Sequence, residues 1–210
     1  INRSCSFIYN NLVSYYDPNK NTSFYGTMNG NDTYVVSVSN PFKYHGINKS
    51  ISNKITSIKV QNERKSLVTC IKWCKLLDRR LFFVARDDGI LNVYNSNLKS
   101  VAFSYQIKTK NINSPNNSCP QINCMDTDNQ HIFFGTSGGE IHSLKVFKNK
   151  IINSSIIYKH SDEINCCVKY TSMIYFGCND GSILCYNIST NACNIFITPS
   201  TNMIPCTCIN

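Results

Sequence analysis

Short apolar runs separated by turn residues recur along most of the chain. The run RLFFVA at 80–85 meets a turn at Asp87-Asp88-Gly89, and the segment ILNVYN at 90–95 then alternates with a period of two. Such alternation is typical of a β-strand with one buried face. An Asp-Gly pair favours a tight hairpin, because glycine accepts the positive φ angle that the turn requires. No helical periodicity longer than one turn occurs, so the pattern predicts an all-β fold.

The same arrangement of strands and turns is repeated along the sequence. A cysteine follows a β-branched residue and a small or polar residue in four segments: VTCI at 68–71, INCM at 122–125, INCC at 164–167 and IPCT at 204–207. These cysteines are 54, 42 and 40 residues apart. The first three segments are each followed by a block with a glycine turn and then by one more strand: SVAFSYQI, INSSIIYK or CNIFITP. Self-similarity at this period indicates a repeat protein, here with four strands in each unit.

The first part of the chain fits the same plan less closely. SFYGTMNG at 23–30 and DTYVVSVSN at 32–40 predict a hairpin, and FKYHGIN and ITSIKV supply two more strands. The Asn-, Ser- and Pro-rich segment at 108–121 is predicted to be a loop insertion. We therefore expect a single domain over 1–210, with units at 1–67, 68–110, 122–158 and 160–199, and with 203–210 opening another.

The segment FGCNDGSILCYN at 176–187 resembles the end of a WD repeat, in which an aromatic residue and an acid or amide follow a glycine-turned hairpin. Tyr186-Asn187 and Tyr94-Asn95 stand where that family usually has Trp-Asp. The resemblance implies a β-propeller of four-stranded antiparallel blades, with about four blades plus one strand visible. Propellers close with roughly four to eight blades and WD-repeat rings most often have seven, so we expect this chain to be part of a larger ring.

The resemblance also implies structural positions within the repeat. In the family, a His ahead of the inner strand and an Asp in the hairpin turn form a buried hydrogen-bond network. His160 and Asp180 match these positions in the unit at 160–199. Asp88 matches the Asp in the unit at 68–110, where no His stands at the right place upstream. The unit at 122–158 departs from the pattern, because it has Gly138 instead of the Asp and Leu144 instead of the aromatic residue.

The twelve cysteines do not form a recognisable metal-binding or disulfide pattern. Disulfide frameworks belong to short secreted chains, and a structural zinc site needs two well-formed pairs of ligands, which the short cysteine spacings here do not supply. The repeat places Cys166, Cys178 and Cys185 on strands, where we expect them to act as small buried hydrophobes. Free cysteines fit a reducing compartment, so an intracellular location, in the nucleus, nucleolus or cytoplasm, is predicted.

No catalytic motif is present, and no cofactor, metal or small-molecule substrate is expected. The glycines of GTSGG at 135–139 and the paired carboxylates of ARDDG at 85–89 are explained by hairpin turns rather than by phosphate binding or acid–base catalysis. Cys119 lies in a loop with no His placed to activate it. Trp73, the sole tryptophan, is expected to pack in the interior.

The chain carries a net charge of +9, which favours anionic partners. The candidate anion- or partner-binding residues come from one unit: Lys72, Lys75, Arg79, Arg80 and Arg86. The alternative is a solvated basic surface with no specific partner. No run of eighteen apolar residues and no signal peptide is visible, so no membrane insertion is expected.

Fold and charge together predict a non-enzymatic scaffold that binds other proteins of a multi-subunit complex. The segment at 24–48 resembles the opening blade of WD-repeat subunits of the small-subunit processome, and with the positive charge it favours ribosome biogenesis or another ribonucleoprotein assembly. Two alternatives remain open at this stage. One is direct RNA binding through a basic rim, and the other is a substrate receptor of a ubiquitin ligase or a vesicle-coat subunit.

Overall fold

The computed structural model describes residues 12–39, 54–60, 65–108, 119–199 and 204–207. Over these residues all regular structure is β, in sixteen strands. The first two sheets consist of β1 (Leu12–Asp17), β2 (Thr22–Asn29), β3 (Asp32–Ser39) and β4 (Lys54–Val60), and of β5 (Val68–Leu76), β6 (Arg79–Arg86), β7 (Ile90–Tyr94) and β8 (Val101–Gln106). The third and fourth sheets consist of β9 (Ile122–Thr127), β10 (His131–Thr136), β11 (Glu140–Phe147) and β12 (Lys150–Lys159), and of β13 (Ile164–Tyr170), β14 (Met173–Cys178), β15 (Ile183–Asn187) and β16 (Ala192–Ile197).

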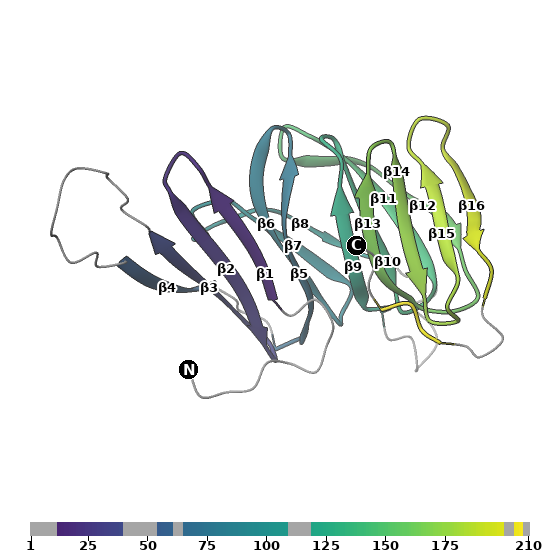
Figure 1. The fold of residues 1–210 in the computed structure, drawn as a ribbon, viewed down its shortest axis with the longest axis horizontal. Helices are drawn as coiled ribbons and strands as arrows, with labels where there is room; N and C mark the ends of the chain where they lie inside the picture. Colours follow the sequence, from purple (N-terminus) through teal and green to yellow (C-terminus); the bar gives the residue numbers. More distant parts are fainter. Residues whose placement is uncertain (1–11, 40–53, 61–64, 109–118, 200–203, 208–210) are drawn as a thin grey trace, which may run out of the picture.

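Each sheet is an antiparallel meander in which neighbouring strands follow one another in the sequence. The four sheets lie side by side (Figure 1). Their first strands, β1, β5, β9 and β13, are in contact one after the next and form the inner strands of the array. The all-β prediction is confirmed, and four-stranded antiparallel sheets in this arrangement are propeller-type blades.

Glycine fixes the same turn in every sheet. The second hairpin of each sheet contains a glycine with positive φ: Gly30 at 62°, Gly89 at 73°, Gly139 at 76° and Gly181 at 85°. A side chain at such a φ angle is strained, whereas glycine adopts it at little cost. A glycine therefore recurs in the sequence because the same turn geometry recurs in each sheet.

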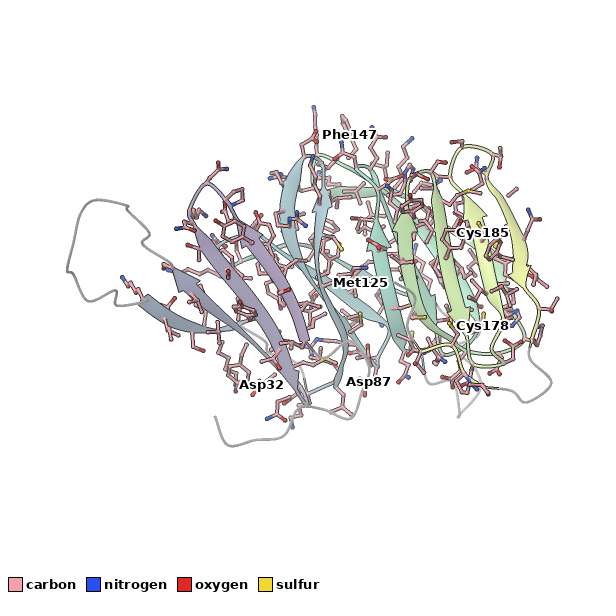
Figure 2. The ribbon with its side chains drawn as sticks, in the orientation of Figure 1. Asp32, Asp87, Met125, Phe147, Cys178 and Cys185 are labelled. Atoms are coloured by element: carbon pink, nitrogen blue, oxygen red, sulfur yellow. The ribbon has the colours of Figure 1, made fainter. Side chains whose placement is uncertain are left out.

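The hydrophobic cores lie between the sheets rather than within any one of them. Met28 and Phe82 belong to the core between the first and second sheets, Phe134 belongs to the next core, and Phe133 and Phe176 belong to the core between the third and fourth sheets. Side chains fill the space between neighbouring ribbons (Figure 2). Because the second and third sheets bury apolar side chains on both faces against their neighbours, these sheets are stable only within the stack.

The first and last predicted segments differ in part from the expectation. The hairpin predicted at 23–40 is present as β2 and β3, but β1 was not predicted, because LVSYYD carries no glycine turn signal of its own. The segment FKYHGIN lies outside the described residues. Residues 204–207 contain no strand; Pro205 has no N–H with which to pair, although the Cys206 N–H donates to the Cys178 carbonyl at 3.0 Å.

Candidate interaction site

The predicted hydrogen bond between His160 and Asp180 is present. His160 Nε2 lies 2.9 Å from Asp180 Oδ2, and the Ser182 hydroxyl donates to Asp180 Oδ1 at 2.7 Å. These residues tie the connection before β13 to the turn between β14 and β15. Burial acts to raise the pKa of Asp180, but the hydrogen bonds from Ser182 and His160 outweigh it and lower that pKa below its usual 3.8.

We expect Asp180→Asn to make the protein less sensitive to acid. Because the folded-state pKa of Asp180 is lowered, its ionised form stabilises the fold above about pH 4, and this contribution is lost as pH falls through the folded-state pKa. Urea unfolding at pH 7, 4 and 3 should show a lower stability of the variant at pH 7 and a smaller loss on acidification than the wild type shows. Glu163→Gln, at a nearby exposed carboxylate, is the control and should follow the wild type; equal acid sensitivity of wild type and Asp180→Asn would contradict the assignment.

The other repeat positions are structural too. The Tyr186 hydroxyl donates to Asn191 Oδ1 at 2.8 Å while its ring packs in the core between the third and fourth sheets. In the second sheet the carboxylate of Asp88 accepts the N–H of Ile90 at 3.2 Å, which closes the hairpin turn. Tyr94 is buried in the core between the first and second sheets.

His160, Asp180 and Cys178 also form the one group of three possible metal ligands within the described part of the chain, with ligand atoms within 4.8 Å of one another. Hydrogen bonds account for two of the three side chains. Burial raises the pKa of the Cys178 thiol to about 11, so it is protonated at neutral pH and a poor ligand as it stands. We therefore interpret the cluster as a structural hydrogen-bond network.

The cysteines on the strands are small core residues, as predicted. Cys166, Cys178 and Cys185 are buried, and none of the ten cysteines that the structure describes forms a disulfide. Figure 2 places Cys178 and Cys185 on the last sheet. Burial raises the pKa of Cys119 as well, which makes this loop thiol less reactive rather than more.

The five basic candidates do not form one rim. Arg86 is 1% exposed, and its guanidinium donates to the carbonyls of Ser66 at 2.6 Å and Asn31 at 3.4 Å. The expectation that Arg86 lies on the surface is wrong, because β6 buries its last six residues and carries this arginine to the turn of the neighbouring sheet. The ammonium of Lys72 forms an intramolecular ion pair with Asp126 at 2.8 Å, so its charge is already neutralised within the protein.

The three remaining basic residues are exposed on the face formed by the first turn of each sheet. Lys75 pairs with Asp78 at 3.2 Å, and Arg79 donates to the side chain of Asn149 in the third sheet. The Arg80 guanidinium lies 4.4 Å from the centroid of the Tyr15 ring. An exposed ion pair such as that of Lys75 and Asp78 contributes little to stability, and the contacts described for Arg79 and Arg80 are with neutral groups, so these charges remain available to a partner.

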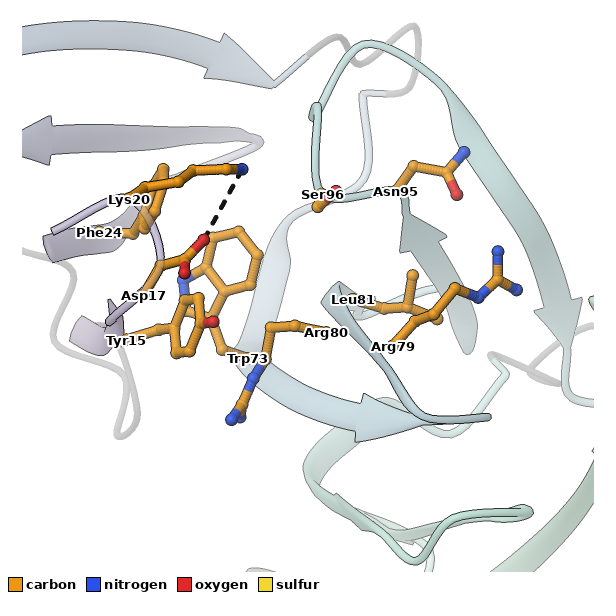
Figure 3. A pocket seen from close by; sticks show the side chains of 10 residues that line it. All are labelled: Tyr15, Asp17, Lys20, Phe24, Trp73, Arg79, Arg80, Leu81, Asn95 and Ser96. Atoms are coloured by element: carbon orange, nitrogen blue, oxygen red, sulfur yellow. Dashed lines mark ion pairs between the residues drawn. The ribbon is translucent and has the colours of Figure 1, made fainter. Parts of the chain in front are cut away.

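A cavity of about 280 Å³ opens on this same face between the first two sheets. In each antiparallel meander the turns after the first and third strands lie at one end. The β1–β2, β5–β6 and β7–β8 turns therefore meet around the cavity and supply its polar side chains, among them Lys20, Arg79 and Asn95 (Figure 3). The sequence pointed to Arg79 and Arg80 but not to the cavity, because Tyr15 lies on the unpredicted β1.

Trp73 packs in the interior as predicted and also lines this cavity. Its ring centroid is 4.7 Å from that of Phe82, 5.8 Å from Tyr15 and 5.9 Å from Phe24. The three rings of Tyr15, Phe24 and Trp73, which we call the aromatic wall, close one side of the cavity. Aromatic groups beside exposed cations are a combination that protein interfaces favour.

Comparison with known proteins supports the fold. The chain matches no family profile and no curated protein sequence. It is similar in structure to a chain of the Mitotic Checkpoint Complex (TM-score 0.63, 14% identity, covering 94% of this chain and 53% of that one) and to a chain of an active polycomb repressive complex 2 in the basal state (TM-score 0.60, 12% identity, covering 86% and 37%). It is also similar to the computationally designed protein Ika4 (TM-score 0.54, 12% identity, covering 88% and 96%).

At these identities the likeness concerns the fold alone, and it defines the class of protein as an all-β array of propeller-type blades. The chain spans about half the length of the mitotic checkpoint chain that it matches. The described residues contain no helix that is long and apolar enough to cross a membrane.

Proposed function

We propose that this chain is a non-enzymatic scaffold that binds other proteins within a multi-subunit assembly. The observation that carries the proposal is a stack of sheets with cores between them that presents exposed cations and an aromatic-walled cavity on one face. Loops on a rigid framework are the usual place for binding function. The similarity to chains from two multi-protein complexes, the mitotic checkpoint complex and polycomb repressive complex 2, supports a protein partner.

A finer proposal is that the fold is a WD-repeat β-propeller that serves a ribonucleoprotein assembly such as ribosome biogenesis, in the nucleus or nucleolus. The hydrogen bond between His160 and Asp180, at the positions where WD repeats carry their structural His and Asp, supports the first part. The net charge of +9 supports the second part.

The test is a crosslinking pull-down from cell extract, with and without RNase and at low and moderate salt. We expect a coherent set of protein partners that survives RNase and changes little between the two salt concentrations, because contacts with an apolar centre depend less on ionic strength. Recovery of ribosome-assembly proteins in that set would support the finer proposal. Disappearance of the whole set on RNase treatment would contradict a protein scaffold.

Direct RNA binding is the second candidate, and the exposed Arg79 and Arg80 beside the aromatic wall favour it. RNA is bound by phosphate contacts from Arg and Lys and by stacking of bases on aromatic rings. Such binding would weaken steeply with salt. A pull-down in which RNA is recovered at low salt and lost at moderate salt, together with all proteins, would support it.

A further inference from the structure

The cavity between the first and second sheets has the features of a binding site rather than of a packing defect. Its walls come from two sheets, and one of its residues, Trp73, is 7% exposed. Trp73 Nε1 is buried and has no hydrogen-bond partner in the part of the chain that the structure describes. A buried N–H without an acceptor is costly, and native structures generally provide one through a neighbouring group or a ligand.

Charge around the cavity is predominantly positive. Three cationic side chains, those of Lys20, Arg79 and Arg80, line it, against the single carboxylate of Asp17. Asp17 lies 3.7 Å from the Lys20 ammonium, as the dashed line in Figure 3 shows. That pair offsets one positive charge and leaves the two guanidinium groups, which extend on different sides of the cavity in Figure 3, to attract an anion.

Contact with the Tyr15 ring positions Arg80 to bind an anion. Its guanidinium carbon lies over the Tyr15 ring, 4.4 Å from the ring centroid, in a cation–π contact that attracts the side chain to the ring without a hydrogen-bond acceptor. A guanidinium offers a planar fork of donors that matches a carboxylate. The side chain is exposed, so a partner can reach it without unfolding any part of the sheet.

We propose that this cavity binds an acidic segment of a protein partner, which inserts one apolar side chain against the aromatic wall and places a carboxylate at Arg80. This inference rests on the proposed scaffold function and specifies its partner by chemistry. A small shift of the wall on binding would let a carbonyl of the segment accept the N–H of Trp73.

The geometry favours a peptide over RNA. A cavity of about 280 Å³ is at the lower end of ligand pockets and takes one side chain rather than a row of stacked bases. Single-stranded RNA is bound along a continuous basic groove. Here Lys72 and Arg86, which would extend the basic surface beyond the cavity, are paired with Asp126 or buried.

Trp73 is the sole tryptophan, so its fluorescence reports occupancy of the cavity directly. The probe is a five-residue peptide with phenylalanine at its centre and two acidic residues on each side, titrated into the whole chain up to 1 mM. We expect a saturable change in Trp73 emission. In Arg80→Ala the peptide should bind about tenfold more weakly, since one charge-assisted hydrogen bond is lost. Lys150→Ala, at an exposed lysine outside the cavity, should bind as the wild type does.

Three results would overturn the proposal: no change in emission up to 1 mM, equal binding of a peptide with lysine in place of the acidic residues, or tighter binding of an eight-nucleotide uridine RNA than of the acidic peptide. A pull-down with the wild type and with Arg80→Ala distinguishes failure of the cavity assignment from failure of the scaffold function. If the peptide does not bind but the wild type and Arg80→Ala both capture the RNase-resistant partners, the scaffold proposal stands and the cavity assignment is wrong. If the wild type captures no such partners, the scaffold proposal itself falls.

Discussion

Replacing Arg86 by alanine should lower the free energy of unfolding by about 3–5 kcal/mol. Arg86 is almost fully buried and donates to the carbonyl of Ser66, just before β5, and to that of Asn31, in the β2–β3 turn. Its removal leaves both carbonyls without this donor and opens a cavity where the long side chain lay. Loss of a buried charged donor costs more than the net value of its hydrogen bonds, because the acceptors stay desolvated.

Urea unfolding followed by circular dichroism measures this effect. Arg86→Met, which keeps most of the volume but no donor, should recover the part of the loss due to packing, leaving a deficit of about 2 kcal/mol from the carbonyls. Lys75→Ala is the control: its ammonium is exposed and paired with Asp78 at the surface, so the loss should stay below about 1 kcal/mol. An Arg86→Ala protein as stable as Lys75→Ala would show that Arg86 is exposed in solution.

Local sequence was sufficient to predict the repeat. Each sheet contains a glycine in the same turn, and alternation on either side of it marks the two strands that the turn joins. The pair His160 and Asp180 could be predicted in the same way, because the resemblance places both residues within one unit. Both features could be predicted because the residues that form them are close in the sequence; His160 and Asp180 are 20 residues apart.

Features that depend on contact between sheets could not be predicted. Arg80 and Arg86 lie on one strand and look alike in the sequence, yet Arg80 is exposed and lies over the partly buried ring of Tyr15, whereas Arg86 is buried. The difference arises from the turn of the first sheet, which meets only Arg86. The cavity is a similar case, since it exists because β1 packs beside β5, and the 50 residues between these strands give no local signal of that contact.

A methyl group at Gly135 should be nearly as damaging as the loss of Arg86. Gly135 lies on β10, where a Cβ atom would come within 2.6 Å of the Cβ of Ile164 on β13 and 3.0 Å of Cys124 Sγ. The Cβ of Ile164 is fixed to the backbone and does not move when the side chain changes rotamer, so the third and fourth sheets would have to separate. We expect Gly135→Ala to cost about 3 kcal/mol, the upper end of the usual range for overpacking a core.

Gly138→Ala, three residues along the same hairpin, is a matched control. Its added Cβ would have no neighbour closer than 3.4 Å, and its φ is not positive, so stability should be unchanged or rise by up to about 1 kcal/mol. Ile164→Ala removes Cγ2, the atom of Ile164 nearest to the added methyl group, but keeps the Cβ. The double variant Gly135→Ala/Ile164→Ala should therefore recover part of the loss and be more stable than the two single losses predict, by about 1 kcal/mol in a double-mutant cycle. Strict additivity would mean that the sheets are not in contact at this point, and the shared core between them would have to be reconsidered.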